Sequence, residues 1–160
     1  MNIRLLRKSE INNASWLVRL NYSKRYESIA HDEIAAMFER ESYKPSYMVA
    51  EDQGHIIGFA GYGQSWMDFR VYHIFWVNVH PEHQGRGVGS LLVSAVIRKI
   101  KARHGRDKKA SVVLITTTAP AFYGAKFGFR PLLKLDKSDF LMALSLAANV
   151  HLNSGAAKYR

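Results

Sequence analysis

Three glycines at alternate positions, Gly85, Gly87 and Gly89, form the stretch of this sequence best suited to chemistry. An apolar, β-branched segment typical of a strand precedes them, and a segment with apolar residues at helical spacing follows them. A helix that begins there leaves its first main-chain N–H groups without partners, at the positive end of its dipole. Because glycines let an anion approach the backbone closely, we predict a phosphate site over residues 84–90.

The spacing of these glycines distinguishes between kinds of phosphate ligand. A P-loop requires Gly-x-x-x-x-Gly-Lys-Ser/Thr, and the sequence contains no such string. The dinucleotide fingerprint Gly-x-Gly-x-x-Gly fails when it is started at Gly85, because position 90 is serine. The acidic residue that this fingerprint needs about 20 positions later is also missing, since residues 106–109 are mostly basic. The pattern Gln/Arg-x-x-Gly-x-Gly/Ala does fit, with Gln84, Gly87 and Gly89.

With this pattern the sequence resembles the GCN5-related N-acetyltransferases, the GNAT family. The string Val-His-Pro-Glu-His-Gln-Gly-Arg-Gly-Val-Gly-Ser-Leu-Leu from Val79 is similar to the acetyl-CoA motif of that family almost residue for residue. The resemblance covers roughly residues 2–146 and implies acetyl-CoA as the co-substrate. It implies that main-chain groups of the strand pair with the pantetheine arm and that the amides of the turn take the pyrophosphate. The cofactor-binding residues that it implies are Val77, Val79, Gln84, Gly85, Arg86, Gly87, Val88, Gly89 and Ser90.

The resemblance also implies a general acid, a tyrosine in the pattern Tyr-x-x-x-Gly-Phe that protonates the departing thiolate. Here four residues rather than three separate Tyr123 from Gly128, so a strict alignment places Gly124 at the tyrosine position. One added residue rotates a helical side chain by about 100°. We predict Tyr123 as the acid, with the extra residue absorbed as a bulge; the alternative is an aromatic packed at a helix start. Thr117 or Thr118 would replace an asparagine that the family often carries before this helix.

The group that takes a proton from the amine is less determined by the sequence. His73 alternates with Val77 and Val79 along the predicted strand, which places it on their face. A histidine there can act as a base, directly or through water, because its pKa is near neutrality. Asp68, in the loop 64–70, is the alternative and would attract a cationic amine.

The acceptor is not determined by any motif. Four aromatic residues could line a pocket beside the thioester, although aromatics in and around strands are usually core residues: Trp66, Phe69, Tyr72 and Trp76. The positive charge of the chain disfavours polyamine and aminoglycoside acceptors. A small primary amine, an amino acid and a peptide amine all stay open.

The composition bounds the class of protein. A length of 160 residues predicts one domain. The net charge of +10 suits an anionic coenzyme; nucleic acid binding is the weaker interpretation, because this charge is the only feature that supports it. The sequence contains no cysteine, which excludes a zinc site built on thiolates and a cysteine nucleophile. His80 and His83 have the spacing of two metal ligands, but no third ligand accompanies them in the sequence, so we expect no metal. No apolar run reaches the ~18 residues of a membrane span and the first residues have no signal-peptide pattern, which predicts a cytoplasmic protein without membrane contact.

Around the glycine motif the sequence predicts both strands and helices. The order is strand, two helices, three strands, helix, strand, helix and two strands. This order predicts an α/β fold with a mixed, mostly antiparallel central sheet and helices on both faces, similar to the GNAT (acyl-CoA N-acyltransferase) fold. Strands are predicted at 2–7, 47–50, 55–62, 71–79, 111–116, after 127–131 and at 136–146, and helices at about 11–20, 28–41, 88–104 and from Pro120. We predict a single domain over residues 1–146 and a loose tail over 147–160.

These observations predict an N-acetyltransferase that moves the acetyl group of acetyl-CoA to a primary amine of a small molecule or peptide, by direct attack in a ternary complex. The alternative is a non-catalytic acyl-CoA-binding module, which would bind the coenzyme without turnover. Between a monomer and a homodimer the sequence does not decide.

Overall fold

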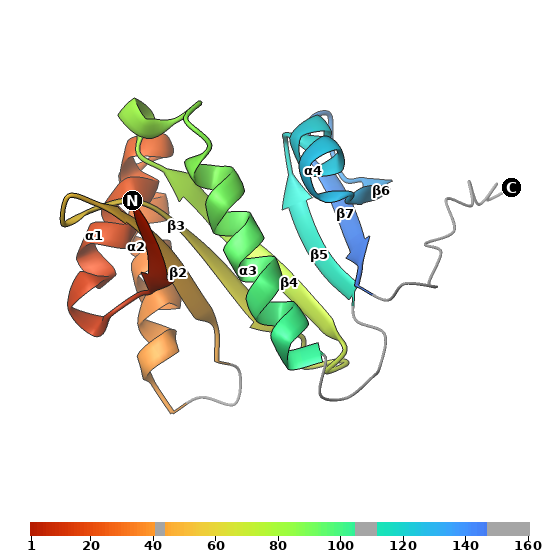
Figure 1. The fold of residues 1–160 in the computed structure, drawn as a ribbon, viewed down its shortest axis with the longest axis horizontal. Coiled ribbons are helices and arrows are strands. Elements are labelled where there is room, and N and C mark those ends of the chain that lie inside the picture. Colours follow the sequence, from red (N-terminus) through yellow and green to blue (C-terminus); the bar gives the residue numbers. More distant parts are fainter. Residues whose placement is uncertain (41–43, 105–111, 147–160) are drawn as a thin grey trace, which may run out of the picture.

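In a computed structural model, which describes residues 1–40, 44–104 and 112–146, the chain forms a seven-stranded sheet with helices on both faces (Figure 1). The strands are β1 Asn2–Leu5, β2 Ser46–Asp52, β3 His55–Gln64, β4 Val71–Val79, β5 Val112–Thr117, β6 Arg130–Lys134 and β7 Phe140–Ser145. The α-helices are α1 Ile11–Asn21, α2 Lys24–Ala35, α3 Val88–His104 and α4 Pro120–Phe127, and short 3-10 helices are η1 Lys8–Glu10, η2 Ala36–Phe38 and η3 Pro81–His83.

The strands are arranged in the order β1-β2-β3-β4-β5-β7-β6. Only the pair β4 and β5 is parallel, and every other neighbouring pair is antiparallel. Helix α3 connects the two parallel strands, as a crossover between parallel strands requires. The predicted mixed, mostly antiparallel sheet is therefore confirmed.

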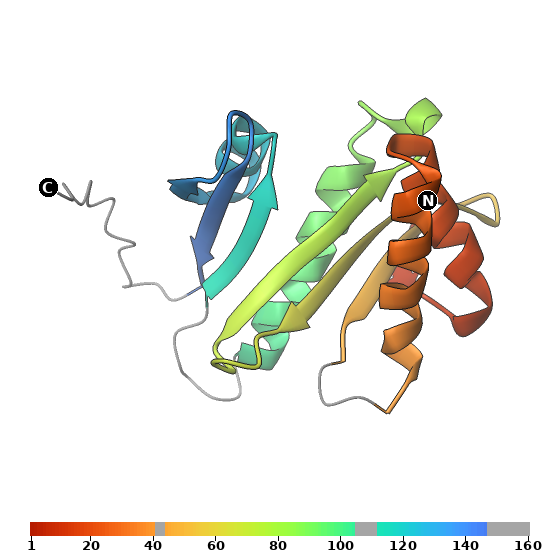
Figure 2. The ribbon, with the colours of Figure 1, turned by 180° about the vertical axis from the view of Figure 1, so that it is seen from behind.

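Each face of the sheet has its own apolar core. On one face α3 packs with inward residues of β2 to β5 and with Tyr123 of α4. On the other face α1 and α2 bury a second cluster that includes Leu17, Ile34 and Phe59. Figures 1 and 2 show these two layers from opposite sides, with α3 nearer in the first view and α1 and α2 nearer in the second.

The pairing between β4 and β5 is short, and this opens the centre of the sheet. Residues 71–73 of β4 pair with residues 112–114 of β5, and no further pair joins the two strands. Beyond this point β4 continues to Val79 and β5 to Thr117, so the two strands diverge, as Figure 2 shows. Among the described strands, β3 alone pairs with the C-terminal half of β4, along one edge.

Several element boundaries differ from those predicted. Helix α2 begins at Lys24 rather than at Ser28, with Ser23 in an extended conformation before it and the Ser23 carbonyl accepting from the Glu27 amide at 3.1 Å. The last strand begins at Phe140 rather than at Asp136, since a turn closed by a 2.8 Å bond from the Leu135 amide to the Asp139 carbonyl precedes it. The predicted tail 147–160 and the loop 105–109 lie outside the described residues. None of the helices in the described ranges combines the length and apolar character needed to cross a membrane.

Candidate active site

The glycine turn lies between the end of β4 and the start of α3. Strand β4 stops at Val79, and Pro81 opens the short helix η3. Gly85 and Gly87 have φ of 72° and 83°, a left-handed conformation that side chains other than glycine adopt at a cost. A Cβ added to either would meet no atom within 4 Å, so the space around both is open. Glycine is needed here for the backbone conformation of an exposed turn.

This turn presents a run of free main-chain donors. The first hydrogen bond of α3 runs from the Leu91 amide to the Gly87 carbonyl, at 3.0 Å. Within the described residues, no group accepts a hydrogen bond from the main-chain N–H groups of Gly85 to Ser90. The side chain of Arg86 is exposed and forms no ion pair with any described residue. Such a run at a helix N-terminus is suited to an anion with several oxygen atoms.

Two side-chain amides connect the turn to the end of α1. Gln84 Nε2 donates to Asn21 Oδ1 at 2.8 Å and to the Val79 carbonyl at 3.1 Å. Asn21 Nδ2 in turn donates to the Val79 carbonyl and to Oδ1 of the buried Asn78, both at 3.1 Å. These bonds occupy both lone pairs of the Val79 carbonyl, which leaves the Val79 N–H for a ligand.

A bulge in β4 determines which main-chain groups face the open edge. The register between β3 and β4 shifts at Ala60, where β4 contains one extra residue, and Trp76 there has φ of 49°. The Arg70 carbonyl before the bulge accepts from Val112 of β5, whereas the His80 amide after it donates toward β3. Because alternate residues direct these groups to opposite edges, Val77 and Val79 present theirs to the open side.

A cavity of about 280 Å³ lies where β4 and β5 diverge. Tyr123 of α4 lines it, together with residues of β4, of β5 and of the α1–α2 connection. The tyrosine is only 6% exposed, and no described group hydrogen-bonds to its hydroxyl. Burial raises the pKa of Tyr123 to about 12, and the neighbouring Tyr22 hydroxyl adds to the rise. At neutral pH the phenol keeps its proton, as a proton donor must.

The open edge of β4, the turn with free N–H groups and the cavity lined by Tyr123 are the features to compare with known proteins. The sequence profile of the Acetyltransferase (GNAT) family matches residues 11–129 of the chain. The chain belongs to the GNAT family. A comparison with curated proteins finds no significant match.

Solved structures with the GNAT fold resemble the chain over most of its length. A protein of Desulfovibrio desulfuricans assigned to the family is 16% identical, with a TM-score of 0.77, over 91% of this chain and 99% of that one. An aminoglycoside 6'-N-acetyltransferase complexed with coenzyme A is 16% identical, with a TM-score of 0.72, over 94% and 100%. A GNAT acetyltransferase of Brucella melitensis in complex with acetyl-CoA is 18% identical, with a TM-score of 0.67, over 94% and 90%. At these identities the likeness shows the fold.

Because of the bulge in β4, the prediction that His73 lies on the same face as Val77 and Val79 is wrong. His73 shares the α1–α2 face with Phe75, whereas Val77 and Val79 pack on the α3 side. The extra residue at Trp76 reverses the alternation, so His73 does not share a face with the two valines. Burial lowers the pKa of His73, which keeps the imidazole neutral at pH 7. His73 is not among the described residues that line the Tyr123 cavity.

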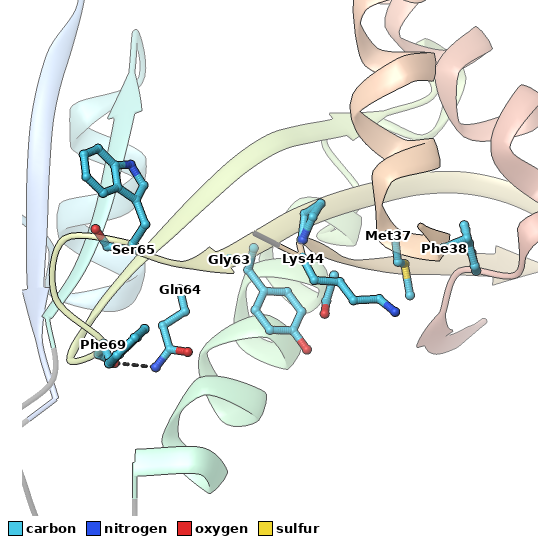
Figure 3. A pocket seen from close by; sticks show the side chains of 11 residues that line it. Met37, Phe38, Lys44, Gly63, Gln64, Ser65 and Phe69 are labelled. Atoms are coloured by element: carbon cyan, nitrogen blue, oxygen red, sulfur yellow. Dashed lines mark hydrogen bonds between the residues drawn. The ribbon is translucent and has the colours of Figure 1, made fainter. Parts of the chain in front are cut away.

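The predicted aromatic pocket does not form as one unit. Trp76 lines the Tyr123 cavity, but Tyr72 is buried in the core on the α3 side. Trp66 and Phe69 line a separate cavity of about 640 Å³ beside the loop that precedes β4, shown in Figure 3. Asp68 in this loop is paired with Arg70, at 2.7 Å. This loop precedes β4 and the glycine turn follows it, so the two lie at opposite ends of the strand.

The structure adds site residues that no motif indicated. Tyr22 and Asp139 line the cavity. Asn21 accepts a hydrogen bond from the side chain of Gln84, and Glu33 accepts one from the indole of Trp76. They lie far along the sequence from the residues that they meet in the site, 63 residues between Asn21 and Gln84 and 43 between Glu33 and Trp76, so spacing could not connect them. Among the described residues, no group of three or more histidine, aspartate or glutamate side chains could hold a metal ion.

Proposed function

We propose that the chain transfers the acetyl group of acetyl-CoA to a primary amine, by direct attack within a ternary complex. The observation that carries the proposal is the run of free N–H groups from Gly85 to Ser90, placed directly after the open edge of β4. Two of the GNAT structures that resemble the chain hold coenzyme A or acetyl-CoA.

The residues of the turn and of β4 fit the two halves of this coenzyme. The diphosphate would bind the amides of Gly85 to Ser90, near Arg86, because the Gln84 amide of the predicted set already donates to the Pro81 carbonyl at 3.3 Å. The pantetheine arm would add to the open edge of β4, using main-chain groups of Val77 and the N–H of Val79. When it is bound, acetyl-CoA supplies an acetyl thioester to the space between β4 and β5.

Tyr123 supplies the proton that completes the transfer. The amine nitrogen forms a bond to the acetyl carbon, and the bond from this carbon to sulfur breaks. The departing thiolate takes the proton of the Tyr123 hydroxyl, which regains one from solvent, and the amine loses its surplus proton to solvent. Holding both reactants in one cavity contributes much of the rate enhancement, because effective molarity can provide roughly 7–11 kcal/mol.

Release of the free thiol of coenzyme A, measured with a panel of primary amines, tests this proposal. We expect thiol release only when acetyl-CoA and a competent amine are both present. Calorimetry with acetyl-CoA alone provides the second measurement. Binding without turnover across the whole panel would favour the acyl-CoA-binding module instead.

A further inference from the structure

The cavity beside Tyr123 has a charge opposite to that of the whole protein. The chain carries a net charge of +10, yet no lysine, arginine or histidine is among the described residues that line this cavity. Asp139, directly before β7, is the one carboxylate in that lining. The other lining groups are hydroxyls and apolar or aromatic side chains. A cation is therefore attracted into this cavity, whereas an anion finds no cationic side chain among the lining residues.

Two aromatic side chains that line the same cavity, Tyr22 and Trp76, contact each other, and Tyr26 packs against both without lining the cavity itself. The rings of Tyr22 and Tyr26 each meet the Trp76 ring edge-on at 6.5 Å between centroids, and they lie 5.8 Å from each other. The exposed fractions of Tyr22 and Tyr26 are 62% and 48%, which is high for tyrosines in mutual contact. Such a group of rings binds cations through ring faces and binds planar groups by packing.

The Trp76 ring is fixed by two features that a core residue does not need. Its backbone has φ of 49°, a conformation that is rare for a bulky side chain and that tends to occur at functional sites. Its indole N–H donates to the carboxylate of Glu33 on α2. A carboxylate at the indole nitrogen adds electron density to the ring and so strengthens its attraction for a cation.

We infer that the acceptor is a small arylalkylamine, which binds as its ammonium ion and carries no carboxylate next to the amine. The ammonium group releases one proton to solvent before its nitrogen attacks the acetyl carbon. This inference rests on the proposed acetyl transfer and specifies its acceptor. Asp139 and Trp76 attract the ammonium group, and the Tyr22 ring packs against the aryl group. An α-amino acid is excluded because its carboxylate would be desolvated beside Asp139 without a cation.

The size of the cavity supports a small acceptor. Its volume of about 280 Å³ is at the lower end of the roughly 300–1,000 Å³ that ligand sites occupy. The end of the pantetheine arm must share this space. An oligosaccharide-sized acceptor would therefore have to bind mostly outside the cavity.

Three probes with one phenyl ring separate the possibilities: phenethylamine, L-phenylalanine, which adds a carboxylate, and 2-phenylethanol, which lacks the charge. We expect kcat/KM for phenethylamine to exceed that for L-phenylalanine by at least about tenfold, since an unpaired buried charge is costly. We expect 2-phenylethanol to be a weak competitor. Equal rates with the amine and the amino acid would overturn the inference.

A matched pair of variants on one turn tests Asp139 directly. Asp139→Asn should raise KM for phenethylamine about tenfold, because a charge-assisted contact is lost, and should leave the affinity for acetyl-CoA unchanged. Asp136→Asn removes an exposed carboxylate of the same turn that does not line the cavity, and should change neither value. An unchanged KM in Asp139→Asn would contradict the inference.

Calorimetry of phenethylamine binding to the protein loaded with coenzyme A separates the two proposals. If no amine is acetylated but phenethylamine binds, and binds more weakly to Asp139→Asn, the acetyl transfer fails and the inferred ligand class stands. If other amines are acetylated but phenethylamine neither binds nor reacts, the ligand class fails and the acetyl transfer stands.

Discussion

The side-chain amide nitrogen of Gln84 lies 2.8 Å from Oδ1 of Asn21 and donates a hydrogen bond to it, across 63 residues of sequence. Gln84 belongs to the turn proposed to bind the diphosphate, and Asn21 ends helix α1. The next residue, Tyr22, lines the cavity proposed for the amine. The two proposed ligand sites are therefore connected through one pair of side chains.

Removing Asn21 should affect both ligands. We expect Asn21→Ala to weaken acetyl-CoA binding about fivefold and to raise the KM of the amine, as changes at coupling positions typically cost ~0.5–2 kcal/mol. It should also destabilise the fold by about 1–3 kcal/mol, because Oδ1 of the buried Asn78 loses its donor. Calorimetry, steady-state kinetics and thermal unfolding measure the three effects. Asn13→Ala, at an exposed position of the same helix, is the control, and equal effects in both variants would refute the connection.

Tyr123→Phe should separate chemistry from binding. General acid catalysis typically contributes 10²–10⁴-fold, so we expect kcat to fall by about this factor while the affinity for acetyl-CoA is retained. Single-turnover kinetics with a competent amine measure the loss. An unaltered rate would remove Tyr123 from the mechanism.

The pH dependence of Tyr123 gives an independent measurement. Because its pKa is raised to about 12, the folded protein holds this proton above the ordinary tyrosine value of 10.0. The difference in phenolate absorbance between the wild-type protein and Tyr123→Phe should therefore appear near pH 12. The unfolded chain releases the same proton near pH 10, so this residue's contribution to stability falls between pH 10 and 12. A difference signal centred at pH 10 would mean that Tyr123 is not buried in solution.

His73→Gln tests the base predicted from the sequence. A general base contributes about 10²–10⁴-fold, and we expect a loss below tenfold, because His73 does not line the cavity. The pKa of His73 is lowered by burial, so any dependence of the rate on its neutral form must lie below pH 6.5. A hundredfold loss, together with the disappearance of an acid limb in that range, would assign the base to His73 after all.

The sequence predicts local structure well where one pattern controls it. Strand β4 has the predicted bounds, Val71–Val79, because its β-branched run ends before Pro81. Helix α3 begins at Val88, the first of the apolar residues that recur at helical spacing. Both boundaries are set by residues close together in the sequence. The mixed sheet and the family are confirmed on the same basis.

What the sequence could not provide depends on contacts between distant segments. Counting every second residue placed His73 beside Val77, and the bulge at Trp76 reverses this count. The sequence offered a glycine opposite it, Gly61 of β3, but β4 itself contains no glycine or proline at the bulge. Glu33 reaches Trp76 across 43 residues, and neither residue carries a motif. Asp139 enters the cavity because β7 follows β5 in the sheet, which is a property of topology rather than of spacing.

The central claim is that the main-chain amides between residues 84 and 90 bind the diphosphate of the coenzyme, and a pair of matched variants tests it. Gly87 and Gly54 have nearly the same conformation, with φ of 83° and 81°, and a Cβ at either meets no atom within 4 Å. Glutamate therefore brings similar backbone strain and the same charge at both positions, but only Gly87 lies in the turn. Calorimetric titration with coenzyme A should show no binding to Gly87→Glu and wild-type affinity for Gly54→Glu. Retained affinity in a folded Gly87→Glu protein would contradict the claim.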